Sequence, residues 1–155
     1  MAGMVWTDDL SVGIGVIDSQ HMRIVDYINQ LHRAHETGEQ AMLNRVLDEL
    51  IDYTQSHFGF EETILEDAGY VFLKAHQRIH ALFIRKVSEF QERHRAGEDI
   101  AQELNTILVS WLINHIKRED SDYSATVRKH MGHTAETPAK QGSRLSSALR
   151  RFFRG

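Results

Sequence analysis

Apolar residues recur every three or four positions along four stretches of the chain, and short polar links containing glycine separate these stretches. The stretches cover residues 19–37, 40–66, 71–95 and 99–130. Each carries a single apolar stripe, which is typical of an amphipathic helix with one buried face. Because short links make neighbouring helices antiparallel, the pattern predicts an all-α fold, an up-down-up-down antiparallel four-helix bundle.

The two ends of the chain lack this periodicity. Residues 1–18 predict an irregular N-terminal arm that packs on the bundle through Val5, Trp6 and Leu10. We expect one bundle domain over residues 1–131, which includes this arm. Residues 132–155 then form a C-terminal extension, with a linker followed by a basic tail.

Composition restricts the chemistry that the chain can perform. The 155 residues include one proline and no cysteine, so disulfides, thiolate metal sites and cysteine nucleophiles are excluded. Any metal must therefore be bound by nitrogen and oxygen atoms. No apolar run is long enough to span a bilayer, and the first residues do not resemble a signal peptide, so we expect a cytoplasmic protein.

Charge differs sharply between the body and the tail. Residues 1–131 carry 13 Lys+Arg against 21 Asp+Glu, a net charge of −8, whereas residues 132–155 carry five basic residues against one acidic residue, a net charge of +4. An acidic body argues against nucleic-acid binding. Residues 144–154 form a cationic amphipathic pattern, which could contact an anionic membrane or a partner protein, or fold back on the acidic bundle.

Histidines and carboxylates occur at helical spacing in three places. His57 and Glu61 lie four residues apart, as do His76 and His80, and His115 is followed closely by acidic residues. Residues four apart share one face of a helix. Imidazole and carboxylate together suit iron, zinc or manganese better than calcium or magnesium. Each pattern taken singly is weak, because such pairs also occur on ordinary helix surfaces.

The positions of these patterns in the predicted bundle strengthen the metal interpretation. In an up-down bundle, the start of an odd-numbered helix and the end of an even-numbered helix lie at the same end of the molecule. His21 lies near the start of the first helix, and the other candidates lie near the end of the second, the start of the third and the later half of the fourth. All four helices therefore present candidate ligands at about the same level. Five other histidines are displaced from this level, and we expect them to be solvated or packing residues: His32, His35, His94, His130 and His133.

The fourth helix leaves its carboxylate undecided. Glu119 is nearly in line with His115 on a regular helix, whereas Asp120 lies about 140° away. A π-bulge near residues 115–120 would bring Asp120 onto the face of His115. Local geometry alone therefore favours Glu119 but leaves Asp120 possible.

The combined set resembles the ligand signature of the hemerythrins, and as a combination it is highly specific. The segments that carry the resemblance run from Trp6 to His21, from His57 to Glu62 and from His115 to Tyr123, within residues 4–131. The first of these is similar to the bacterial branch of the family. The resemblance implies that Asp120 is the carboxylate of the fourth helix.

The resemblance also implies a cofactor, namely two iron ions joined by an oxo or hydroxo bridge. One iron would be held by His76, His80 and His115, and the other by His21 and His57. The carboxylates of Glu61 and Asp120 would bridge the two irons. One coordination position would stay open on the iron with two histidines, where dioxygen would bind. Five side chains resemble the apolar lining of the family's oxygen pocket, although they also fit an ordinary bundle core: Ile24, Phe58, Trp111, Leu112 and Ile116.

The functional hypothesis is reversible dioxygen binding for transport, storage or delivery to an oxygen-using client enzyme, without catalysis. Oxygen-activating di-iron bundles use Glu-x-x-His motifs, and zinc proteases use His-Glu-x-x-His; the chain has neither motif. Two alternatives remain open at this stage. One is an oxygen or redox sensor acting through a partner, and the other is a di-iron enzyme that reduces nitric oxide or peroxide.

Overall fold

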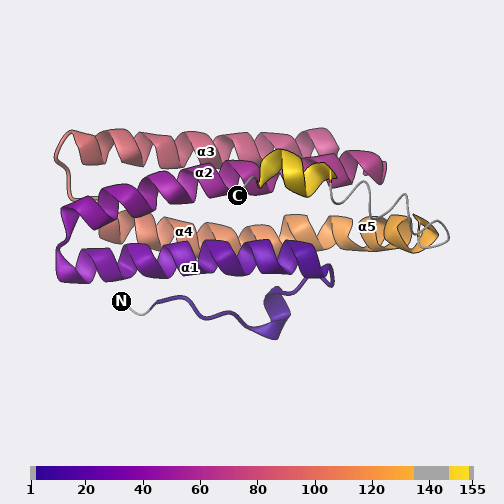
Figure 1. Cartoon of the computed structure of the whole chain (residues 1–155), viewed down its shortest axis with the longest axis horizontal. Helices are drawn as coiled ribbons and strands as arrows, with labels where there is room; N and C mark the ends of the chain where they lie inside the picture. The colour runs from indigo at the N-terminus through magenta and orange to yellow at the C-terminus, as the bar shows by residue number, and fades with distance from the viewer. Residues whose placement is uncertain (1–2, 135–146, 154–155) are drawn as a thin grey trace.

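The computed structural model describes residues 3–134 and 147–153. Long helices dominate the chain, and they run antiparallel along one axis (Figure 1). The elements are η1 (Asp8–Leu10), α1 (Gly15–Thr37), α2 (Gln40–Asp67), α3 (Leu73–Arg95), α4 (Ala101–His115), the π-helical segment η2 (Ile116–Asp120) and α5 (Ser121–Thr134). Because α4, η2 and α5 follow one another directly and continue in the same direction, they serve as the fourth helix. The all-α four-helix bundle predicted from periodicity is confirmed.

Helix boundaries agree with the predicted stretches to within four residues, and the largest differences lie at the start of the first helix and the end of the fourth. The first helix begins at Gly15, four residues earlier than expected, so the irregular arm is shorter than predicted. The Asp18 carboxylate accepts a hydrogen bond from the backbone N–H of Val12 at 2.9 Å, which holds the arm against the first turn of α1. At the other end of α1, Gly38 adopts φ 71°, a left-handed conformation that favours glycine and ends the helix.

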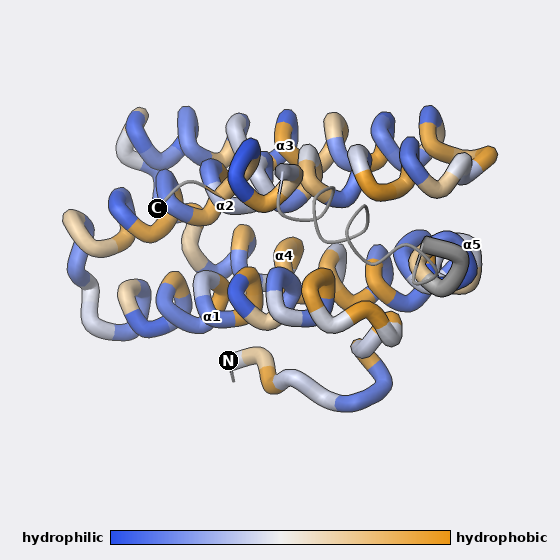
Figure 2. Tube along the Cα trace, turned by 45° about the vertical axis from the view of Figure 1, so that its right-hand side comes forward, coloured by the Kyte–Doolittle hydropathy of each residue, from blue (hydrophilic) through white to orange (hydrophobic). Residues whose placement is uncertain are grey.

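The core lies between the helices, where their apolar stripes meet. Figure 2 shows apolar and polar positions alternating along each helix, as a one-sided burial pattern requires. Ile28, Leu31 and Leu50 are fully buried. In the arm, Leu10 is buried and Trp6 packs against the core, as predicted, but the prediction for Val5 is wrong because its side chain is 76% exposed.

A short C-terminal helix over residues 147–152 lies along α2 (yellow in Figure 1). Ala148 is buried, and the ring of Phe153 lies 5.3 Å from that of Tyr53 and 5.9 Å from that of Phe60, between centroids. Arg150 is exposed on the outer side. The described part of the amphipathic tail therefore folds back on the bundle, whereas the predicted contributions of Arg144, Leu145 and Arg154 lie outside the described residues. None of the described helices is long and apolar enough to cross a membrane.

Candidate metal centre

Seven side chains from four helical stretches converge in one buried cluster near the end of the bundle. They are the residues singled out in the sequence, and each is at most 3% exposed: His21, His57, Glu61, His76, His80, His115 and Asp120. The five histidines point their Nε2 atoms at the two carboxylates. The structure therefore brings all seven side chains together at one level of the bundle.

Glu61 lies between two groups of histidines. Its Oε1 atom is 2.6 Å from Nε2 of His76 and 3.1 Å from Nε2 of His80. Its Oε2 atom faces the other way, 3.3 Å from Nε2 of His57 and 3.9 Å from Nε2 of His21. One carboxylate thus presents one oxygen to each group.

Asp120 repeats this division from the fourth helix. Its Oδ1 atom is 3.1 Å from Nε2 of His115 and 3.2 Å from Nε2 of His76, and its Oδ2 atom is 3.1 Å from Nε2 of His21. The ligand atoms form two overlapping clusters, in each of which all atoms lie within 4.8 Å of one another: Glu61, His76, His80, His115 and Asp120 in one, and His21, His57 and Glu61 in the other. Two neighbouring metal ions that share their carboxylates fit this arrangement.

The π-helical segment η2 decides which acidic residue of the fourth helix enters the cluster. A π-turn accommodates one more residue than an α-turn, so it aligns position i with i+5. Asp120 is consequently buried beside His115, while Glu119 lies outside with its carboxylate 3.6 Å from Nδ1 of His115. The simple helical expectation for Glu119 does not hold, because the backbone is not a regular α-helix here.

Several buried polar atoms of the cluster have no hydrogen-bond partner within the described protein. They are Nδ1 and Nε2 of His21, Nε2 of His57, Nδ1 of His115 and both carboxylate oxygens of Asp120. Burying such atoms without a partner costs free energy. A bound metal ion would offset this cost, because it would be coordinated by their lone pairs. The donor set of imidazole nitrogens and carboxylate oxygens fits iron.

Electrostatics in the metal-free cluster reflect close contact between acids and bases. Burial by itself raises the pKa of Glu61, but the close imidazoles of His57, His76 and His80 outweigh it and hold that pKa well below its usual value. Burial lowers the pKa of His76, yet the neighbouring carboxylates of Asp120 and Glu61 raise it from 6.5 to about 10. The metal-free site therefore retains protons that metal binding would displace.

Three polar side chains next to the cluster had not been identified as site residues from the sequence. The Tyr123 hydroxyl donates a hydrogen bond to Oε2 of Glu61 at 3.0 Å, and it is buried. Gln20 offers its Oε1 atom to Nδ1 of His57 at 2.6 Å, and Glu62 lies 3.0 Å from Nδ1 of His80. Gln20 and Glu62 directly adjoin candidate ligands in the sequence, and that adjacency was the available signal.

Aromatic rings surround the histidines on one side. Phe58 stacks on His80 with 3.7 Å between ring centroids, and Trp111 stacks on His115 at 4.4 Å. Phe83, which the sequence indicated only as a core residue, stacks on Trp111 at 3.9 Å. The remaining residues of the predicted lining are buried in the core: Ile24, Leu112 and Ile116.

The other histidines lie apart from the cluster within the described part of the chain. His32 pairs with Glu36 on its own helix at 3.1 Å. The metal-ligand groupings found among the described residues include neither this histidine nor three others: His35, His94 and His130. The side chain of His133 is not described.

A four-helix bundle with five histidines and two shared carboxylates in its core defines the class of non-haem dinuclear metal proteins. Residues 12–127 match the family model described as the hemerythrin HHE cation binding domain. The chain belongs to the hemerythrin family, whose members bind dioxygen at a di-iron centre, and the buried cluster fits that cofactor.

Individual relatives agree with this family assignment. The chain is 51% identical over 153 residues to the bacteriohemerythrin of Pseudomonas aeruginosa strain LESB58, covering 99% of each chain. It is 35% identical over 125 residues to the bacteriohemerythrin of Methylococcus capsulatus, covering 79% of this chain and 95% of that one. A crystal structure of wild-type hemerythrin superimposes with a TM-score of 0.77 at 32% identity, covering 81% of this chain and 98% of that one.

Proposed function

We propose that the protein binds dioxygen reversibly at a di-iron centre and that the seven clustered residues are its protein ligands. His76, His80 and His115 hold one iron, and His21 and His57 hold the other. Glu61 and Asp120 bridge them. The observation that carries this proposal is the division of each carboxylate, because each directs one oxygen atom to each group of histidines.

When bound, the iron pair would supply reversible two-electron chemistry toward dioxygen. The chain's own residues hold the ligands and exclude water. Tyr123 and Gln20 fix Glu61 and His57 by hydrogen bonds. We propose that five apolar side chains form a dry oxygen pocket: Ile24, Phe58, Trp111, Leu112 and Ile116. Four of them are at most 4% exposed, and Trp111 packs against the core.

Within oxygen binding, we propose transport, storage or delivery to a client enzyme, and no catalysis. The histidine-rich donor set supports this role, because five neutral imidazoles contribute no negative charge, whereas oxygen-activating di-iron bundles use mostly carboxylates. The Pseudomonas aeruginosa and Methylococcus capsulatus relatives carry the name bacteriohemerythrin.

Stopped-flow mixing of the reduced, iron-loaded protein with oxygen tests the function. We expect a change in the visible spectrum that argon reverses over repeated cycles, together with two irons per chain by metal analysis. Immediate, irreversible oxidation to a ferric form would contradict the carrier function and favour a sensor or an enzyme reducing nitric oxide or peroxide.

We further propose that residues 1–131 form the oxygen-binding unit, whose last helix continues to Thr134, and that residues 132–155 are a linker and tail in a cytoplasmic protein. Contact of the tail with an anionic membrane or a partner would use the exposed Arg150 and Arg151, since the apolar side of the same helix packs on α2. Liposome flotation of the full chain and of an Arg150→Glu/Arg151→Glu variant tests this contact; equal recovery would contradict it.

A further inference from the structure

The outer nitrogens of three clustered histidines face different groups: those of His80 and His115 face carboxylates, and that of His57 faces an amide. On the three-histidine side, Nδ1 of His80 lies 3.0 Å from the Glu62 carboxylate, and Nδ1 of His115 faces the Glu119 carboxylate at 3.6 Å. On the two-histidine side, Nδ1 of His57 lies 2.6 Å from the neutral amide oxygen of Gln20. A carboxylate therefore stands behind His80 and, at a longer distance, behind His115, whereas a neutral amide stands behind His57.

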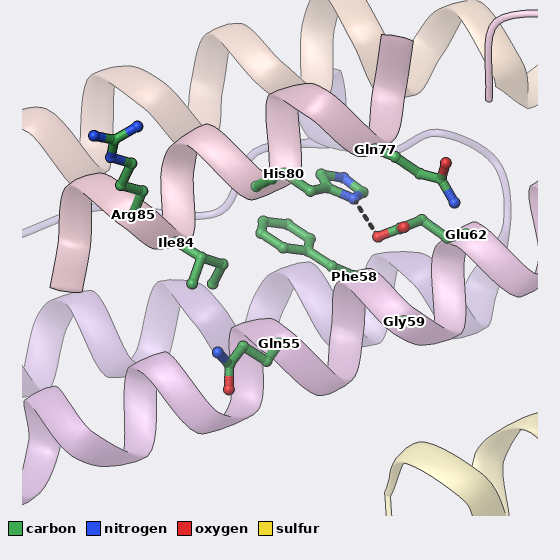
Figure 3. Close-up of a pocket in the computed structure, with 9 residues that line it drawn as sticks. Gln55, Phe58, Gly59, Glu62, Gln77, His80, Ile84 and Arg85 are labelled. Atoms are coloured by element: carbon green, nitrogen blue, oxygen red, sulfur yellow. Dashed lines mark hydrogen bonds and ion pairs between the residues drawn. The ribbon is translucent and has the colours of Figure 1, made fainter. Parts of the chain in front are cut away.

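Glu62 is well placed to act on His80. The His80 ring is held in one orientation, because Phe58 stacks on it with an interplanar angle of 4° and only 3% of the His80 side chain is exposed. Figure 3 shows the Glu62 carboxylate reaching from α2 to the imidazole on α3. If Nε2 binds a metal ion, the imidazole carries its proton on Nδ1, and the Glu62 carboxylate is placed to accept a hydrogen bond from it.

Within the pair of Glu62 and His80, Glu62 is the side chain that is exposed to solvent. A groove of about 450 Å³ runs between α2 and α3, and its lining includes Glu62, Gln77, Phe58 and His80 (Figure 3). The Glu62 side chain is 24% exposed, so it keeps part of its hydration beside the buried histidine.

We propose that Glu62 is a positioning residue that orients His80 and makes it a stronger electron donor, so that the three-histidine iron is favoured in its oxidised state. A carboxylate that accepts the outer N–H of a metal-bound histidine fixes the ring and raises its basicity. Greater donation stabilises the ferric iron and lowers its reduction potential. The amide of Gln20 orients His57 without adding charge. This inference rests on the proposed function, because it assigns different electronic roles to the two sides of the same di-iron centre.

The principal test replaces Glu62 by Gln, which preserves shape and an acceptor oxygen while removing the charge. The matched control is Glu66→Gln, since Glu66 lies one turn further along α2 and is exposed. Both variants are loaded anaerobically with Fe²⁺, and two quantities are measured without oxygen: the midpoint potential and the release of iron to excess ferrozine. We expect E62Q to raise the potential and to bind iron about 10- to 100-fold more weakly, with E66Q like the parent.

Gln20→Glu supplies the reciprocal change, because it places a carboxylate behind His57. We expect the midpoint potential to fall in this variant, an opposite shift that a merely structural role would not produce. Equal potentials for E62Q and E66Q, or a Q20E potential that does not fall, would overturn the inference. Failure of the parent protein to bind oxygen reversibly would instead contradict the proposed function, and it would leave these oxygen-free comparisons interpretable.

Discussion

At the scale of single residues, the site depends on carboxylates that serve two partners at once. Glu61 and Asp120 each place one oxygen near His76 and the other near the His21 side of the cluster. Tyr123 adds a buried hydrogen bond to Glu61 and so limits its rotation. Since each of these side chains is nearly inaccessible to water, losing one ligand leaves the others without compensation.

His76→Ala is expected to lose at least one of the two irons per chain and to destabilise the loaded protein. His76 contacts both carboxylates, at 2.6 Å to Glu61 and 3.2 Å to Asp120, so the substitution disturbs both irons. Metal analysis and thermal unfolding measure the two effects. His94→Ala, on the same helix but outside the cluster, is the control. Unchanged iron stoichiometry in His76→Ala would show that this histidine is not a ligand.

At the scale of helices, the π-helical segment η2 is the feature that shapes the site. Periodicity predicted the fourth helix and the level of His115, but a regular α-helix would have directed Glu119 inward. The extra residue in the π-turn places Asp120 there instead. Family resemblance, rather than the helical pattern, indicates Asp120, since a sequence pattern contains little information about a local change in hydrogen-bond spacing.

Deleting Arg118 is expected to preserve the iron site, whereas inserting an alanine after Arg118 is expected to abolish it. The deletion converts the π-turn into an α-turn, and the carboxylate then lies four residues after His115, which is nearly in line. The insertion rotates everything beyond it by about 100° and turns Asp120 out of the cluster. Arg118 is exposed, so the deletion removes little packing. Iron content and circular dichroism compare both variants; equal iron loss would contradict this account.

At the scale of the whole molecule, the C-terminal helix covers the part of α2 that carries two of the clustered residues. Gly59 lies between His57 and Glu61, and a Cβ atom added at Gly59 would overlap the ring of Phe152. The absence of a side chain at this position therefore permits the terminal helix to approach α2.

Gly59→Ala is expected to displace the terminal helix. In an unobstructed helix this substitution stabilises by about 0.5–1 kcal/mol, because glycine loses more backbone freedom on folding. Here that gain should appear only when Phe152→Ala removes the overlapping ring. Urea unfolding of the parent, the two single variants and the double variant measures the coupling. Additive changes in the free energy of unfolding would show that the two residues do not meet.

The buried charges also make the stability of the whole metal-free chain depend on pH. Burial lowers the pKa of His76, but the neighbouring carboxylates of Asp120 and Glu61 raise it to about 10, so its protonated form stabilises the fold fully below pH 6.5. This contribution is lost as the pH rises through about 10. The pKa values of His21 and His80 are raised as well, which adds in the same direction.

Urea midpoints of the metal-stripped protein are therefore expected to fall between pH 7 and pH 10. The fall should be smaller in His76→Gln, which has no proton to lose. It should also be smaller in the iron-loaded protein, where the histidines are neutral ligands. A midpoint that stays constant or rises in the stripped parent protein would contradict the charge arrangement described for the site.

The sequence by itself determined the helices, their antiparallel order and the common level of the histidines, because apolar periodicity and link length are local properties that directly set helix direction and register. Only the tertiary structure decided what depends on distances between helices or on backbone irregularity. This includes the two-sided placement of Glu61, the π-turn that selects Asp120 over Glu119, and the contacts of Gln20 and Glu62 behind their histidines. It also includes the docking of the tail, since an amphipathic pattern specifies an apolar face but not the surface that this face will cover.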